Sequence, residues 1–183
     1  INEKDPDKFI EVVKSISTTF GGINLEDIKA PEAFKIEKEL VDQLDIPVMH
    51  DDQHGTAIIS AAALLNALEL VNKKIEDVKI VVSGAGAAAI ACTKLYISFG
   101  AKLENIVMTD SRGVINNSRD GLSEEKKFFA TKRKITTLEE AMVKSDVFIG
   151  LSMANIVSEN MLKSMSKDPI VFAMANPDPE INY

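Results

Sequence analysis

Two groups of residues in this chain have the types and spacing expected of a ligand-binding or catalytic site. The first is the segment Gly84-Ala85-Gly86-Ala87-Ala88-Ala89, which follows the apolar run 78–83 and opens a long apolar stretch. A strand, a tight glycine turn and a helix in this order are typical of dinucleotide-binding folds. Gly84 would permit the turn, and Gly86 would let the backbone approach a pyrophosphate. The helix N-terminus would offer N–H groups and partial positive charge to the phosphates. The alternative is a turn that serves only helix–sheet packing.

The next apolar run, residues 105–109, ends at Asp110, whose carboxylate would accept hydrogen bonds from ribose hydroxyls. An aspartate at this point repels a 2′-phosphate and so favours NAD. Arg112 could instead pair with that phosphate and favour NADP. The residues alone slightly favour NAD. The cofactor is therefore expected to be NAD or NADP.

The second group consists of two acidic pairs, Glu26-Asp27 and Asp51-Asp52, which each end a short apolar run. Carboxylate oxygens without paired Cys or His residues suit a hard cation such as Mg²⁺ or Mn²⁺. Acidic pairs also occur as solvated charges or helix caps. His50 and His54 flank the second pair, and each could be a ligand, a base or a turn residue hydrogen-bonded to the backbone.

Composition limits the possible partners. The formal net charge of −7 argues against nucleic acid and anionic membranes, and a hydrophobic content of 45% is enough for a core. Cys92 is the single cysteine, which excludes an internal disulfide and fits a reducing, cytoplasmic location. No apolar run reaches the ~20 residues of a membrane span. The first residue is Ile, so we expect a piece of a longer protein.

Helices and strands must position these residues, and from Val78 onward they alternate. This predicts an α/β fold with a Rossmann-like, doubly wound parallel sheet. The sequence pattern predicts strands at 23–28, 46–49, 78–83, 105–109, 147–150 and 170–174. It predicts helices at 6–20, 31–44, 56–71, 87–99, 123–130, 137–144 and 158–166, with a polar turn at 50–56. The helix at 56–71 is nearly all Ala, Ile and Leu and should be buried on most sides.

Ligands of parallel sheets bind beyond the carboxyl ends of the strands. The residues at those ends are Gly84, Asp110, Leu151-Ser152 and Asn176, and we expect them to meet in one crevice. Asn176 could otherwise cap the turn before Pro177.

Several of these motifs together resemble malic enzymes. Residues 20–34 (FGGINLEDIKAPEAF) are similar to the metal-site segment of that family, and residues 46–57 (IPVMHDDQHGTA) to its bacterial-type subgroup. The Gly84 turn and residues 172–180 (FAMANPDPE) fit the same family in the same order. The resemblance covers nearly the whole chain. It implies metal-dependent oxidative decarboxylation of malate to pyruvate and CO₂ with reduction of NAD or NADP.

The resemblance also assigns roles to residues. It implies a divalent metal, Mg²⁺ or Mn²⁺, held by Glu26, Asp27 and Asp52, with Asp51 beside the ligands and steadying them. Asn176 would hydrogen-bond the substrate carboxylate or the nicotinamide side. The dinucleotide phosphates would be lined by Ala85, Gly86, Ala87 and Ala88. Residues 1–50 would be the C-terminal strip of a substrate- and metal-binding domain, and residues 51–183 an NAD(P)-binding domain. The full-length family members form homo-oligomers.

Some family features are missing from this sequence. The family's catalytic Lys and Tyr have no match here, and neither Tyr96, in an apolar helix, nor Tyr183, at the end, is a convincing substitute. A further asparagine motif beyond Asn176 is absent. Met153-Ala154-Asn155 stands where a small or glycine-rich turn is expected. The chain is therefore predicted to be the cofactor-binding portion. The alternatives are a non-catalytic module that binds a dinucleotide and a metal, and a metal-independent dehydrogenase of similar fold.

Overall fold

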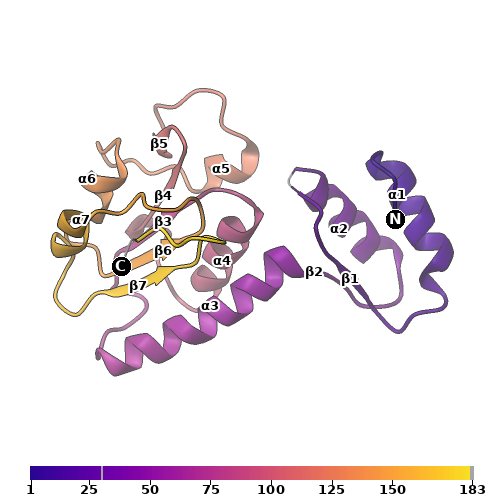
Figure 1. Ribbon diagram of the computed structural model, residues 1–183, viewed down its shortest axis with the longest axis horizontal. Helices are drawn as coiled ribbons and strands as arrows, with labels where there is room; N and C mark the ends of the chain where they lie inside the picture. Colours follow the sequence, from indigo (N-terminus) through magenta and orange to yellow (C-terminus); the bar gives the residue numbers. More distant parts are fainter. Residues whose placement is uncertain (30, 182–183) are drawn as a thin grey trace.

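The computed structural model describes residues 1–29 and 31–181 and consists of a small N-terminal unit, an α/β unit and a long helix between them (Figure 1). The Asp5-Pro6 pair begins the first helix, because the Asp5 carboxylate accepts hydrogen bonds from two backbone N–H groups of its first turn. The N-terminal unit contains α1 (Pro6–Ser17), β1 (Ile23–Leu25), α2 (Glu32–Gln43) and β2 (Val48–His50). Its core is formed by Ile10, Val13, Leu25, Ile36 and Leu40.

Helix α3 (Asp51–Leu70) differs from the sequence prediction in two ways. Residues 51–56 of the predicted polar turn form the first part of this helix, where Asp51 and Asp52 stabilise its positive N-terminal end. Gly55 is accommodated in the helix because its missing side chain leaves room for the Asp51 carboxylate. The prediction that the helix is buried on most sides was also wrong. One face packs on α4, while Ile58, Ile59, Leu65 and Leu70 are exposed.

The α/β unit is built on a five-stranded sheet with the order β5-β4-β3-β6-β7. Four strands are parallel, which confirms the predicted Rossmann-like fold, whereas the short edge strand β5 is antiparallel and was not predicted. The strands are β3 (Ile80–Ser83), β4 (Ile106–Asp110), β5 (Gly113–Val114), β6 (Val147–Gly150) and β7 (Ile170–Ala173).

Helices cover both faces of this sheet (Figure 1). Side chains alternate along β3, so Ile80 and Val82 contact α3 and α4 (Ala87–Ser98), while Val81 contacts α6 (Leu138–Met142) and α7 (Glu159–Lys163). A capping box of Thr137 and Glu140 opens α6. This helix, α7 and α5 (Glu124–Phe128) are shorter than predicted. The remaining element is the 3₁₀ turn η1 (Leu103–Asn105).

The chain order reverses at the centre of the sheet, since β4 pairs with one edge of β3 and β6 with the other. Rossmann-like folds bind ligands at this switch point, outside the carboxyl ends of the strands. No helix among the described residues has the length and apolar character needed to cross a bilayer.

Candidate cofactor and metal site

The glycine turn lies at the switch point, directly after β3. Gly84 is buried at φ +120°, and a Cβ there would overlap the carbonyl oxygen of Leu151. The Gly84 N–H donates to the Thr109 carbonyl at 3.0 Å, which joins the turn to β4. Gly86 is exposed, caps α4, and its missing Cβ would meet no atom within 4 Å. The backbone at Gly86 is therefore open to a phosphate at the N-terminus of α4.

Strand register brings the predicted crevice residues to one edge. Ser83 lies opposite both Thr109 and Gly150, and Gly150 lies opposite Ala173. The residues that end or follow these strands, Gly84, Asp110, Leu151 and Met174, therefore stand side by side at what we call the carboxyl edge. Asn176 follows two residues later and is exposed.

Asp110 is not the free acceptor that the sequence suggested. Its two oxygens accept hydrogen bonds from Arg119 Nη1 and Nη2 and from Lys126 Nζ, each at 2.9 Å. The backbone N–H of Arg112 donates to the same carboxylate at 2.9 Å, while the Arg112 side chain donates to the Asp120 carbonyl at 3.2 Å.

These contacts set the charge of the predicted ribose pocket. Burial alone would raise the pKa of Asp110, but the hydrogen bonds from Arg119 and Lys126 outweigh it and hold the pKa well below its ordinary value. Asp110 is thus ionised and is neutralised by two cations. The expected repulsion of a 2′-phosphate by a lone carboxylate does not apply here.

The two acidic pairs meet because β1 and β2 are parallel. Leu25 lies opposite His50, so Glu26-Asp27 and Asp51-Asp52 follow the paired strand ends side by side. β1 ends before the predicted residue 28, and Asp27 adopts φ +57°. In this conformation the Asp27 N–H donates to Asp52 Oδ2 at 3.1 Å.

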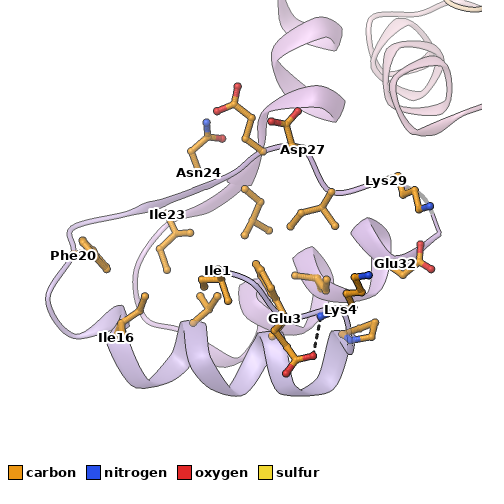
Figure 2. A pocket seen from close by; sticks show the side chains of 17 residues that line it. Ile1, Glu3, Lys4, Ile16, Phe20, Ile23, Asn24, Asp27, Lys29 and Glu32 are labelled. Atoms are coloured by element: carbon orange, nitrogen blue, oxygen red, sulfur yellow. Dashed lines mark hydrogen bonds between the residues drawn. The ribbon is translucent and has the colours of Figure 1, made fainter.

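A cavity of about 950 Å³ opens between α1, β1 and α2 (Figure 2). Apolar side chains such as Phe9, Val13 and Ile36 line much of it. Figure 2 shows Asp27 at its rim, with the carboxylate on the side away from Ile1. Of the two acidic pairs, only Glu26-Asp27 lines this cavity.

An oxygen-only donor set fits a hard divalent cation, and the contact between Asp27 and Asp52 brings two of the three expected ligands together. Within residues 1–29 and 31–181, no three His, Cys, Asp or Glu side chains converge as a ready-made metal cluster. The predicted metal remains a proposal that rests on the donor chemistry and on this contact.

Glu37 on α2 is a contact that sequence reasoning missed. Its carboxylate accepts hydrogen bonds from the His50 backbone N–H at 3.0 Å and from Gln53 Nε2 at 3.3 Å. His54 Nε2 lies 2.8 Å from Glu37 Oε1, so His54 pairs with a side chain of another helix rather than with backbone in a turn. His50 is buried and its Nε2 lies 3.0 Å from the Ile28 carbonyl, a backbone contact as expected. Glu37 therefore anchors the helix end that carries Asp51 and Asp52.

Tyr96 is fully buried between α3 and α4, where its hydroxyl donates to Ser60 at 2.8 Å. The hydroxyl is therefore not exposed to a substrate, and burial raises its pKa. Cys92 lies in the same buried cluster, and burial raises the pKa of its thiol. Tyr183 lies outside the described residues.

A family model described as "Malic enzyme, NAD binding domain" matches residues 53–182. The chain belongs to the malic enzyme family. A second model, "Malic enzyme, N-terminal domain", matches residues 2–41. The structure thus combines segments of both malic enzyme domains.

Individual malic enzymes are similar over almost all of this chain. The "NADP-dependent malic enzyme" of Haemophilus influenzae is 53% identical over 99% of this chain and 24% of its own length. That of Halomonas elongata is 50% identical over 100% of this chain and 43% of its own length. The crystal structure of the NAD-dependent malic enzyme of Thermotoga maritima superposes with a TM-score of 0.93 and 42% identity, over 100% of this chain and 49% of that one. This chain therefore spans less than half of these relatives.

Proposed function

We propose that the complete protein converts malate to pyruvate and CO₂ with reduction of NAD or NADP, in a reaction that requires Mg²⁺ or Mn²⁺. The observation that carries this proposal is the pairing of Asp27 with Asp52 in a malic enzyme chain whose Gly84 turn ends the central strand. This chain would supply the dinucleotide site and the acidic residues, as its cofactor-binding portion.

Each predicted residue has a role in this proposal. Glu26, Asp27 and Asp52 would hold the cation, and Asp51 would steady them from the first turn of α3. The dinucleotide phosphates would lie against the backbone of Ala85, Gly86, Ala87 and Ala88. When bound, the nicotinamide would supply hydride chemistry and the cation would stabilise negative charge that develops on the substrate oxygen.

Asn176 is exposed at the carboxyl edge, where its amide could orient the substrate carboxylate or the nicotinamide side. A base for the malate hydroxyl and an acid for the product carbon are also needed. We place both outside this sequence, because Tyr96 is buried and already donates its proton to Ser60.

We propose NADP as the preferred cofactor. Asp110 is ion-paired with Arg119 and Lys126, so the local charge of the three side chains is positive and suits a 2′-phosphate. Arg112 is exposed beside them. The Haemophilus influenzae and Halomonas elongata relatives are named NADP-dependent, whereas the Thermotoga maritima enzyme is named NAD-dependent.

The other predictions remain proposals of the same kind. We propose a division between residues 1–50, a strip of the substrate- and metal-binding domain, and residues 51–183, the NAD(P)-binding domain. We also propose a cytoplasmic homo-oligomer that binds neither nucleic acid nor membranes. The negative charge and the single buried cysteine support the partners and the location.

Two other functions make different predictions. A non-catalytic module would bind the dinucleotide and Mn²⁺ without turnover, and the missing Lys and Tyr favour it for this segment alone. A metal-independent dehydrogenase would turn over unchanged in the presence of a chelator. The two acidic segments that β1 and β2 hold together argue against a metal-independent enzyme.

A turnover assay on the full-length protein separates the three. Malate, Mn²⁺ and either NAD or NADP are supplied, and reduced cofactor and pyruvate are measured with and without a chelator. The proposal expects both products in equal amounts, a strict metal requirement and a lower KM for NADP. Binding without products, or turnover in the chelator, would overturn it. The isolated 183-residue segment should bind dinucleotide without producing pyruvate.

A further inference from the structure

Glu180 is a fully buried carboxylate that the proposed reaction does not use. Its Oε1 accepts the backbone N–H of Ser152 at 3.0 Å, and its Oε2 accepts that of Ala175 at 3.1 Å. A Cβ on Gly150, the last residue of β6, would overlap the Glu180 carboxyl group. The absent side chain at Gly150 thus makes space for this carboxylate at the carboxyl edge.

The two donors come from different loops. Ser152 belongs to the loop after β6, and Ala175 belongs to the loop after β7 that carries the exposed Asn176. Ser152 Oγ also lies 2.9 Å from Ser83 Oγ, on the residue before the Gly84 turn. A continuous set of polar contacts therefore joins the ends of β3, β6 and β7.

Burying a carboxylate is costly unless it is hydrogen-bonded, and hydrogen bonds to a charged acceptor are stronger than neutral ones. Two backbone donors, one on each oxygen, fix the spacing of the two loops more tightly than an apolar side chain would. Glu180 thereby sets the position of Asn176 from within the same loop, four residues further along the chain.

We propose that Glu180 is a positioning residue for the nicotinamide half of the dinucleotide site. By holding the Ser152 and Ala175 N–H groups, it sets the place of Asn176 at the carboxyl edge. The inference rests on the dinucleotide-binding part of the proposed function. The adenosine half is expected at Asp110 and β4, on the opposite side of β3 from β6 and β7, where Glu180 makes no contact.

This geometry allows the positioning role to be separated from a general structural one. In the full-length protein, Glu180→Gln keeps the shape but turns an NH₂ group toward one of the two N–H donors. We expect it to weaken NADPH binding about tenfold, the effect of losing one charge-assisted hydrogen bond. Binding of ADP, which lacks the nicotinamide half, should stay within about twofold of wild type. NADPH fluorescence and competition by ADP give both dissociation constants.

The matched control is Asp178→Asn, which removes the same charge from an exposed position of the same loop and should leave both constants unchanged. Gly150→Ala tests the inference without changing Glu180 itself, because the added Cβ would displace the Glu180 carboxylate. It should also weaken NADPH binding and leave ADP binding nearly unchanged. Equal losses for NADPH and ADP, no loss for either, or unfolding of both Glu180→Gln and Gly150→Ala would overturn the positioning role. A wild-type protein that binds ADP and NADPH but produces no pyruvate would overturn the proposed function and leave this inference intact, whereas one that binds no NADPH overturns both.

Discussion

The charge of the predicted ribose pocket can be changed by one isosteric substitution, Asp110→Asn. The carboxylate accepts three side-chain hydrogen bonds from Arg119 and Lys126, so its loss leaves two cations uncompensated. At an effective dielectric constant of ~20, removing a negative charge ~6 Å from a 2′-phosphate favours that phosphate by about 2.8 kcal/mol. Screening by salt reduces this to about 1.4 kcal/mol, or roughly tenfold in affinity. The ratio of the NADP and NAD dissociation constants should therefore move about tenfold toward NADP.

The assay is a titration of the full-length protein with NADPH and with NADH at two salt concentrations. Asp120→Asn is the control, because Asp120 is exposed in the same segment and contacts Arg112 only through its backbone carbonyl. The Asp110 variant should also lose about 1–2 kcal/mol of folding stability, since Arg119 and Lys126 are only partly exposed and the amide retains some hydrogen bonds. An unchanged cofactor ratio, or a shift toward NAD, would refute this electrostatic interpretation.

Four further predictions test the site and its support. Asp52→Asn should weaken Mn²⁺ binding at least about tenfold, because it removes one proposed ligand, and calorimetric titration would show whether affinity is retained. Gly84→Ala should destabilise the fold by about 2 kcal/mol or more, since φ is +120° and its Cβ would overlap a carbonyl oxygen; a wild-type unfolding curve in urea would contradict this. Tyr96→Phe removes the hydrogen bond to Ser60 and should cost about 1 kcal/mol of stability with kcat unchanged, so a large fall in kcat would revive a catalytic role for Tyr96. The pKa of Asp110 lies below its ordinary value of 3.8, so the stabilisation that its carboxylate gives to the fold is complete above pH 3.8 and is lost as the pH falls through the native pKa. The difference in unfolding free energy between wild type and Asp110→Asn should therefore shrink from pH 7 to pH 3.

The sequence predicted the parallel strands and the Gly84 turn because their signals are local. An apolar run followed by glycine and small residues specifies a buried strand and a close turn with little help from the rest of the chain. The helices predicted at 6–20 and 137–144 also have local start signals, since Asp5 and Thr137 each satisfy N–H groups within their own helix.

Features that depend on tertiary contacts were missed. Residues 51–56 of the predicted turn are helical, and Glu37, on another helix, holds His50, Gln53 and His54 at the start of that helix. The exposed face of α3 also carries large apolar side chains, among them Ile58, Ile59 and Leu65, so the apolar residues of the sequence did not reveal which face is buried.

The hydrogen-bond partners of two carboxylates, Asp110 and Glu180, could not be predicted from the sequence either. Arg119 and Lys126 reach Asp110 from a charged segment with no periodic pattern. Glu180 lay within a recognised motif, but its role depends on backbone donors from two loops that only the sheet brings together.

The central claim is that the acidic residues after β1 and β2 hold a cation beside the nicotinamide of a dinucleotide bound at the carboxyl edge. Paramagnetic broadening of the nicotinamide proton resonances by Mn²⁺, in the full-length protein with bound NADP, tests it most directly. The account predicts strong broadening of the nicotinamide protons, weak broadening of the adenine protons, and loss of both effects in Asp52→Asn. Equal broadening at both ends of the dinucleotide, or broadening that survives Asp52→Asn, would contradict it.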